Sequence, residues 1–121
     1  MATRQHLEFV LGAVWTLPFQ CEDATGAALN LADPACDLKV RVYSFDRKTL
    51  LLDLSKANGV AFTNAAAGQA TAMVTAAMQT AAQIAAGPLL YDAQAVLADG
   101  TPVDQAGGLI YVAVSGFADF P

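Results

Sequence analysis

Charged side chains are scarce in this sequence of 121 residues. Only 14% of the residues are Asp, Glu, Lys or Arg, against about 25% in a typical soluble domain, whereas 55% are hydrophobic. The net charge is −5 and the basic residues are scattered among apolar ones, so we expect no binding to nucleic acid. The small charged fraction favours a subunit whose surface is covered by neighbours; the alternative is a GC-rich genome that favours alanine.

Groups that carry enzyme chemistry are equally few. His6 is the only histidine, which argues against a Ser-His-Asp or Cys-His arrangement. The sequence has no glycine-rich phosphate loop and no nucleophile elbow. Cys21 and Cys36 are too few for a zinc set, and whether their thiols meet stays open. The acidic turn at 99–104 offers too few oxygen ligands for calcium. We therefore expect no catalytic residues, no metal and no cofactor.

Long apolar runs are also missing. Gly, Pro, Thr or Gln interrupts the longest of them well short of the roughly 20 residues that span a bilayer, so we expect no membrane association. The stretch "MATRQHLEF" (1–9) has no apolar core of signal-peptide length, so we expect synthesis in the cytoplasm with reduced thiols.

Short strand patterns separated by turn residues fill most of the chain, which predicts a β-sandwich or a barrel. Residues 36–44 give the cleanest strand, because Leu38, Val40 and Val42 alternate with polar residues. The length suits one domain, which we place at 7–116, between an N-terminal arm (1–6) and a C-terminal tail (117–121). The other predicted strands are 7–12 paired with 13–21, then 48–54, 60–62, 68–74, 89–98 and 108–116.

One segment has a different period. Alanine-rich residues follow Thr75, a good N-cap, and Gly87–Pro88 is a typical helix stop, so we predict one short helix over about 75–86. Its predicted apolar stripe consists of Met78, Ala81, Ile84 and Ala85.

Two late strands, 89–98 and 108–116, carry apolar residues on both faces. In a two-layer sandwich the opposite sheet covers only the inner face of each strand. The outer face then needs the helix, a terminal arm or another subunit to cover it.

Four segments, taken in order, resemble the small tail-associated domains related to the baseplate upper protein of tailed bacteriophages. They are "LGAVWTLPF" (11–19), "DATGAALNLADPACDLKVRVYS" (23–44), "GQATAMVTAAMQTAAQIAAGPLLYDAQAVLADG" (68–100) and "GGLIYVAVSG" (107–116). The resemblance implies an immunoglobulin-like antiparallel β-sandwich with a structural role in the virion. It implies no catalytic residues.

We therefore expect a non-enzymatic virion subunit of the tail or baseplate, made in the cytoplasm of the bacterial host. Its partners would be copies of itself and other virion proteins, and it would position a fibre or a receptor-binding protein. The expected docking arms are 1–6, with His6, and 116–121, in which Phe117 and Phe120 precede Pro121 and belong to no predicted strand. The expected exposed apolar face consists of Tyr111, Val112 and Val114.

Two alternatives remain open. A head decoration or neck protein would use the same kind of surface at another place in the particle. A carbohydrate- or ligand-binding sandwich would use aromatic side chains, for which the candidates are Trp15, Tyr43 and Tyr91.

Overall fold

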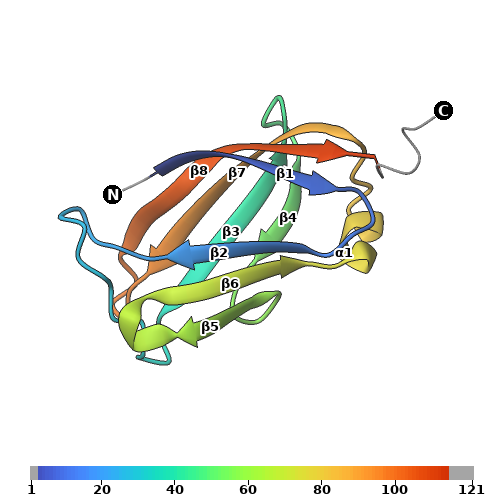
Figure 1. Ribbon diagram of the computed structural model, residues 1–121. Coiled ribbons are helices and arrows are strands. Elements are labelled where there is room, and N and C mark those ends of the chain that lie inside the picture. The colour runs from blue at the N-terminus through green and yellow to red at the C-terminus, as the bar shows by residue number, and fades with distance from the viewer. Residues whose placement is uncertain (1–2, 115–121) are drawn as a thin grey trace.

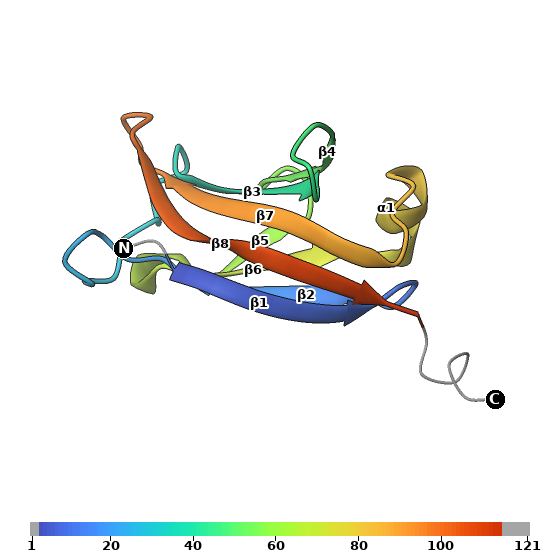
Figure 2. The ribbon, with the colours of Figure 1, turned by 90° about the horizontal axis from the view of Figure 1, so that it is seen from above.

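Two β-sheets packed face to face, with one short helix at one end, form the computed structural model, which describes residues 3–114 (Figures 1 and 2). This arrangement confirms the prediction of a mainly β, immunoglobulin-like sandwich with a single short helix among these residues. The elements are β1 (Thr3–Val10), β2 (Trp15–Gln20), β3 (Asp37–Ser44), β4 (Leu50–Leu54), β5 (Val60–Asn64), a 3-10 turn (Ala65–Ala67), β6 (Gln69–Val74), α1 (Ala76–Ala81), β7 (Gly87–Val96) and β8 (Pro102–Ala113).

The larger sheet, which we call sheet A, has the strand order β1-β8-β7-β3-β4. The smaller sheet, which we call sheet B, has the order β2-β6-β5. Neighbouring strands in both sheets run antiparallel, except that β1 and β8 run parallel. Each sheet turns one face towards the other and one face outward.

The start of the chain differs from the sequence prediction. Residues 7–12 and 13–21 do not pair with each other, because β1 joins sheet A beside β8 whereas β2 joins sheet B beside β6. The expected N-terminal arm is also wrong for residues 3–6, which belong to β1 and pair with residues 106–109 of β8. These contacts join segments about a hundred residues apart, so the local hydrophobic pattern carries no sign of them.

The core lies between the sheets and is mostly aliphatic, but its two largest fully buried side chains are Trp15 and Tyr91. Trp15 is its largest fully buried side chain, and its ring stacks on Phe9 with 5.3 Å between the ring centroids. The indole Nε1 donates a hydrogen bond of 3.0 Å to the carbonyl oxygen of Val10. Because Trp15 is in β2 whereas Phe9 and Val10 are in β1, this one side chain joins the first strands of the two sheets. Other fully buried members are Leu17, Leu38, Val40, Val42, Leu54, Val74, Tyr91, Ile110 and Val112.

The central strands of sheet A largely match the sequence pattern. The prediction of a strand at 36–44 is confirmed by β3, whose Leu38, Val40 and Val42 are buried. Strands β7 and β8 both start earlier than predicted, at Gly87 and Pro102. The early part of β8 contains Ala106 and two glycines. Because these residues have small side chains or none, this part of the strand shows no clear alternation of apolar and polar residues, and its start was not predicted.

The prediction of a helix capped by Thr75 is confirmed, since the Thr75 hydroxyl accepts a hydrogen bond of 3.2 Å from the backbone N–H of Met78. The helix ends five residues earlier than expected, at Ala81. Gln83 adopts a left-handed conformation (φ 57°), and the N–H of Ile84 donates to the carbonyl of Gln79, which terminates α1. The helix lies at one end of the sandwich and leaves the outward face of β7 and β8 uncovered (Figure 2).

Candidate functional site

Polar and charged side chains gather on the outward face of sheet A. The β-ladder places Lys39 of β3 beside Gln94 of β7, and Gln94 beside Asp104 of β8. One row further along, Asp92 of β7 lies beside Arg41 of β3. Outward side chains of paired strands are neighbours, so cations on β3 face acceptors on β7 and β8.

Hydrogen bonds and ion pairs organise this face. Gln94 donates to Asp104 at 2.7 Å, and Arg47 donates to both carboxylate oxygens of Asp92 at 3.2 and 3.4 Å. Arg41 donates to Asp53 at 3.4 Å. A hydrogen bond with Tyr43 and then the charge of Asp53 raise the pKa of Arg41 above its usual value. The guanidinium therefore stays charged throughout the physiological pH range.

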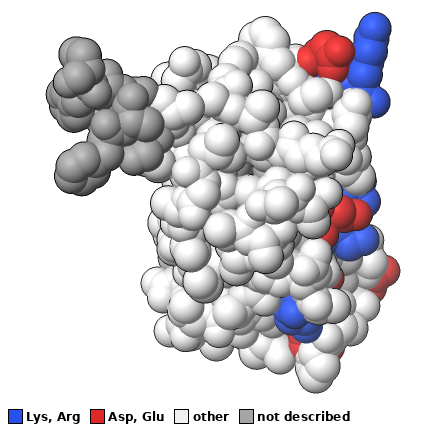
Figure 3. Space-filling view, turned by 90° about the vertical axis from the view of Figure 1, so that its right-hand side faces the viewer, with Lys and Arg blue, Asp and Glu red and all other residues white. Residues whose placement is uncertain are grey.

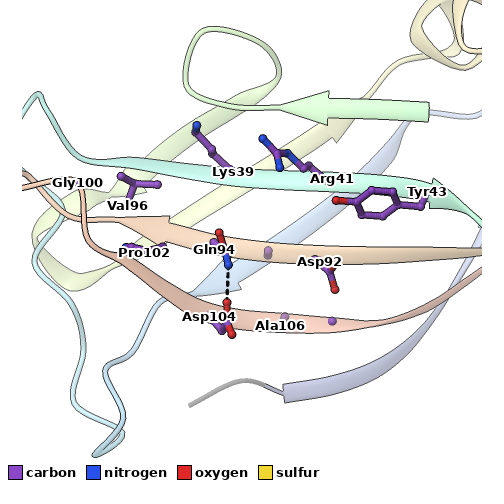
Figure 4. A pocket seen from close by; sticks show the side chains of 12 residues that line it. Lys39, Arg41, Tyr43, Asp92, Gln94, Val96, Gly100, Pro102, Asp104 and Ala106 are labelled. Atoms are coloured by element: carbon purple, nitrogen blue, oxygen red, sulfur yellow. Dashed lines mark hydrogen bonds between the residues drawn. The ribbon is translucent and has the colours of Figure 1, made fainter. Parts of the chain in front are cut away.

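A groove of about 550 Å³ runs across the same face (Figure 4). Its floor is formed by β7 and β8. Gly107 has no side chain, so the Asp92 carboxylate lies over it, with Oδ1 3.1 Å from the position that a Cβ would take. Lys39 and Arg41 line it from β3, and Gly100 and the neighbouring turn of the β7–β8 hairpin line it at one end. Where β7 pairs with β8, the register shifts between Ala93 and Gln94, and an irregularity of this kind bends a strand.

Sheet B presents a different surface. Among the described residues, its three strands and α1 contain no Lys, Arg, Asp or Glu. Figure 3 looks at the end of the sandwich where α1 lies, and the charged side chains gather along one margin of this view. The outward positions of sheet B are Thr16, Pro18, Gln20, Ala61, Gln69, Thr71 and Met73.

Further exposed apolar side chains stand at the α1 end. Val10 and Val114 lie where β1 ends and just after β8, and Val14 directly precedes β2. We call the outward face of sheet B, together with α1 and Val14, the uncharged surface.

The predicted interface residues divide into three groups. Tyr111, Val114 and His6 are exposed, and their role in an interface stays a prediction. His6 belongs to β1 and not to an arm, and its ring nitrogen lies 3.7 Å from the Glu8 carboxylate. The prediction for Val112 is wrong, because Val112 points into the core and is fully buried. The predicted anchors Phe117, Phe120 and Pro121 lie outside the described residues.

Most of the aromatic residues proposed for ligand binding are buried. Trp15 and Tyr91 are fully buried, so the part of that prediction which rests on them is wrong. Only Tyr43 reaches the outward face, where it lines the groove.

Both cysteines, Cys21 and Cys36, are buried and free. Burial raises the pKa of the Cys21 thiol to about 11, so this thiol is protonated near neutral pH. A protonated, buried thiol is a poor nucleophile.

Two buried glutamines have structural roles that the sequence pattern did not reveal. The Gln79 side chain accepts from the N–H of Gly12 at 2.8 Å and donates to the carbonyl of Ala13 at 2.6 Å, which fixes the β1–β2 turn against α1. At the other end, Gln105 of β8 makes the same pair of bonds with the backbone of Glu22, at 2.7 and 2.9 Å. Each glutamine therefore ties a loop beside sheet B to another part of the fold.

The uncharged surface does have a signal in the sequence. Residues 57–91 contain no charged side chain, and this stretch includes β5, β6 and α1. The remaining strand of sheet B, β2, lies within another uncharged stretch, residues 9–21. Counting charges along the chain would have found both stretches, but only the topology shows that they form one surface.

Within residues 3–114 no helix combines the length and apolar character needed to cross a membrane. The same residues contain no cluster of three or more His, Cys, Asp or Glu side chains placed to hold a metal ion.

The fold and the site thus define a small β-sandwich with one grooved, charged face and one uncharged surface. No protein-family model matches the chain, and no curated protein matches it. Among solved structures, the chain is similar to fibronectin(III)-like modules of CbhA from Clostridium thermocellum. The identity is 19% and the TM-score 0.45, over 95% of this chain and 91% of that one.

Proposed function

We propose that the chain is a non-enzymatic structural subunit of a bacteriophage virion, in the tail or baseplate. In this proposal the uncharged surface packs against neighbouring subunits, which are copies of the chain and other virion proteins. The outward face of sheet A stays free, and the subunit positions a fibre or a receptor-binding protein. The phage assignment rests on the sequence resemblance, and the docking mode rests on the distribution of charge.

The observation that carries the docking mode is the absence of charge from the described strands of sheet B and from α1. Burying an unpaired charge is costly, and the centres of protein interfaces are depleted of charged residues. Thr, Gln, Ala and Met lose little when they are desolvated against a complementary surface. The edge strands β2 and β5 have no charge within their bounds. Pro18 interrupts the edge of β2, and the Lys56 ammonium lies 5.4 Å from the centroid of the Phe62 ring in β5, so these edges still carry the usual protection of a soluble sheet.

The test of the docking mode is a pair of matched substitutions. Met73 on sheet B is 44% exposed and Leu50 on sheet A is 46% exposed, so lysine at either position adds a charge at similar cost to the isolated fold. We expect Met73→Lys to reduce incorporation into particles at least tenfold and Leu50→Lys to leave it unchanged. Incorporation is measured by quantitative mass spectrometry of particles purified from cells that express each variant.

Sedimentation velocity of the isolated chain provides a second readout. Wild type and Leu50→Lys should self-associate as concentration rises, whereas Met73→Lys should stay monomeric. Equal incorporation of the two variants would contradict the docking mode. Absence of the wild-type chain from purified particles would contradict the virion role itself.

A head decoration or neck protein remains the alternative within the same class. Immunogold labelling of intact particles separates the two, because label at the tail tip supports the tail or baseplate role and label on the capsid or collar supports the alternative.

A further inference from the structure

The groove on sheet A has the dimensions of a ligand site. Its volume of about 550 Å³ lies within the range of roughly 300–1,000 Å³ that is typical of small-molecule pockets. Three adjacent strands supply the lining, so regular backbone hydrogen bonds hold the side chains in register. Sites built on strands are positioned more accurately than sites on loops.

Donors and acceptors alternate across the groove. In one row Lys39 is a donor, Gln94 is both donor and acceptor, and Asp104 is an acceptor. In the next row Arg41 is a donor and Asp92 an acceptor. Neighbouring strands are about 4.8 Å apart, so each row offers both kinds of partner within the width of one sugar ring.

The charges that line the groove cancel. Lys39 and Arg41 contribute two positive charges, and Asp92 and Asp104 contribute two negative charges. These charges give no net attraction to a ligand of either sign, because each pair repels the charge that the other pair attracts. A hydroxyl group both donates and accepts, so a neutral ligand with many hydroxyls can satisfy both rows at once.

The existing contacts within the groove can yield to such a ligand. The Arg47–Asp92 and Arg41–Asp53 pairs are solvent-exposed, and exposed ion pairs contribute little to stability, so a hydroxyl can insert beside them without a large penalty. The Tyr43 ring offers little stacking surface, because the Arg47 guanidinium lies 5.4 Å from its centroid. Binding would therefore depend on hydrogen bonds, and we expect dissociation constants in the millimolar range.

We propose that this groove, lined by Lys39, Arg41, Asp92, Gln94 and Asp104, binds a neutral oligosaccharide. The proposal does not depend on the virion role. Because the groove and the uncharged surface belong to opposite faces of the sandwich, a subunit docked through sheet B would still present the groove (Figures 2 and 4).

The test is an NMR titration of the full chain, with ¹⁵N-labelled backbone amides as reporters. The probes are the neutral hexasaccharides of the cellulose, starch and chitin series. Oligogalacturonate serves as the anionic probe, fully deacetylated chitosan hexamer as the cationic probe, and a Gly-Ser hexapeptide as the zwitterionic probe. At least one neutral hexasaccharide should shift the amides of residues 39–41, 92–94 and 104–107 in a saturable manner, while the amides of β6 stay unchanged.

Matched substitutions locate the site. Gln94→Ala and Asp104→Ala should each weaken the response at least fivefold, whereas Gln69→Ala, which removes an exposed glutamine from sheet B, should leave it unchanged. Thermal unfolding of all variants controls for folding. Saturable shifts with a charged probe or the peptide alone, shifts centred on sheet B, or no shift with any neutral hexasaccharide would each overturn the proposal.

Discussion

The inward faces of the two sheets are chemically alike, but their outward faces are not. Inside, both sheets contribute aliphatic side chains, such as Val40 from sheet A and Val74 from sheet B. Outside, sheet A carries Arg41, Asp92 and their ion-pair partners, whereas the described strands of sheet B carry no charge.

The core alone does not require this difference, because either outward face would remain in water in an isolated molecule. An isolated sandwich gains solubility from charge on every exposed face, and the common surface pattern mixes both signs throughout. Here only one outward face of the sandwich carries charge. The other outward face has the composition expected of a surface in contact with protein. The difference in charge therefore fits the two proposals above, a small polar ligand on sheet A and a protein partner on sheet B.

The largest expected effect tests whether the two faces belong to one cooperative unit. Trp15 joins β2 of sheet B to β1 of sheet A through its stack on Phe9, so Trp15→Ala should remove about 3–5 kcal/mol from the free energy of unfolding. Urea unfolding followed by far-UV circular dichroism measures the loss, and NMR amide signals of β3 and β6 should disappear at the same urea concentration.

Phe45→Ala is the control for this substitution, because Phe45 is an exposed aromatic residue. We expect it to change stability by less than about 0.5 kcal/mol. Loss of the β6 signals well before those of β3 would mean that the sheets unfold separately, and the contrast between their faces would then be a contrast between two units.

A smaller effect concerns the support of the uncharged surface. Gln79 is 2% exposed and bonds to both Gly12 and Ala13, so Gln79→Ala leaves two backbone groups without their partner. We expect a loss of about 1–3 kcal/mol, measured by the same urea titration.

Gln83→Asn is the matched control for Gln79→Ala. It changes an exposed glutamine of the same segment to a residue that tolerates a positive φ, and should be almost neutral. If both variants were equally stable, the bonds of Gln79 would not be holding the turn against α1.

The sequence was sufficient where the pattern was local and complete. The strand at 36–44 alternates apolar and polar residues without a break, so both its existence and its buried side followed directly. Thr75 was recognisable as a cap because capping depends on a few neighbouring residues. Trp15 and Tyr91, by contrast, could be either core residues or part of a ligand-binding site until the position of the opposite sheet was known.

The features that escaped prediction depend on distant partners. The parallel pairing of β1 with β8 and the bonds of Gln79 and Gln105 cross most of the chain. The groove requires the register of three strands, which has no local signature in the sequence. Gln79 was also hidden by its type, because an amide on a helix is normally assigned to the solvent side.

The smallest expected effect concerns the charged face and sharpens the comparison most. Arg41 and Asp53 form an ion pair in which both side chains are about half exposed, 45% and 52%. A double-mutant cycle with Arg41→Ala, Asp53→Ala and the double variant should give a small coupling free energy, within the range of exposed ion pairs, that falls as salt is added. A small coupling would mean that the charges of sheet A contribute little to folding, so their restriction to one face is better explained by what that face binds. A coupling well above the range of exposed pairs, and insensitive to salt, would make the charged face a structural feature instead. In that case the distribution of charge would no longer support the assignment of one face to ligand and the other to partner.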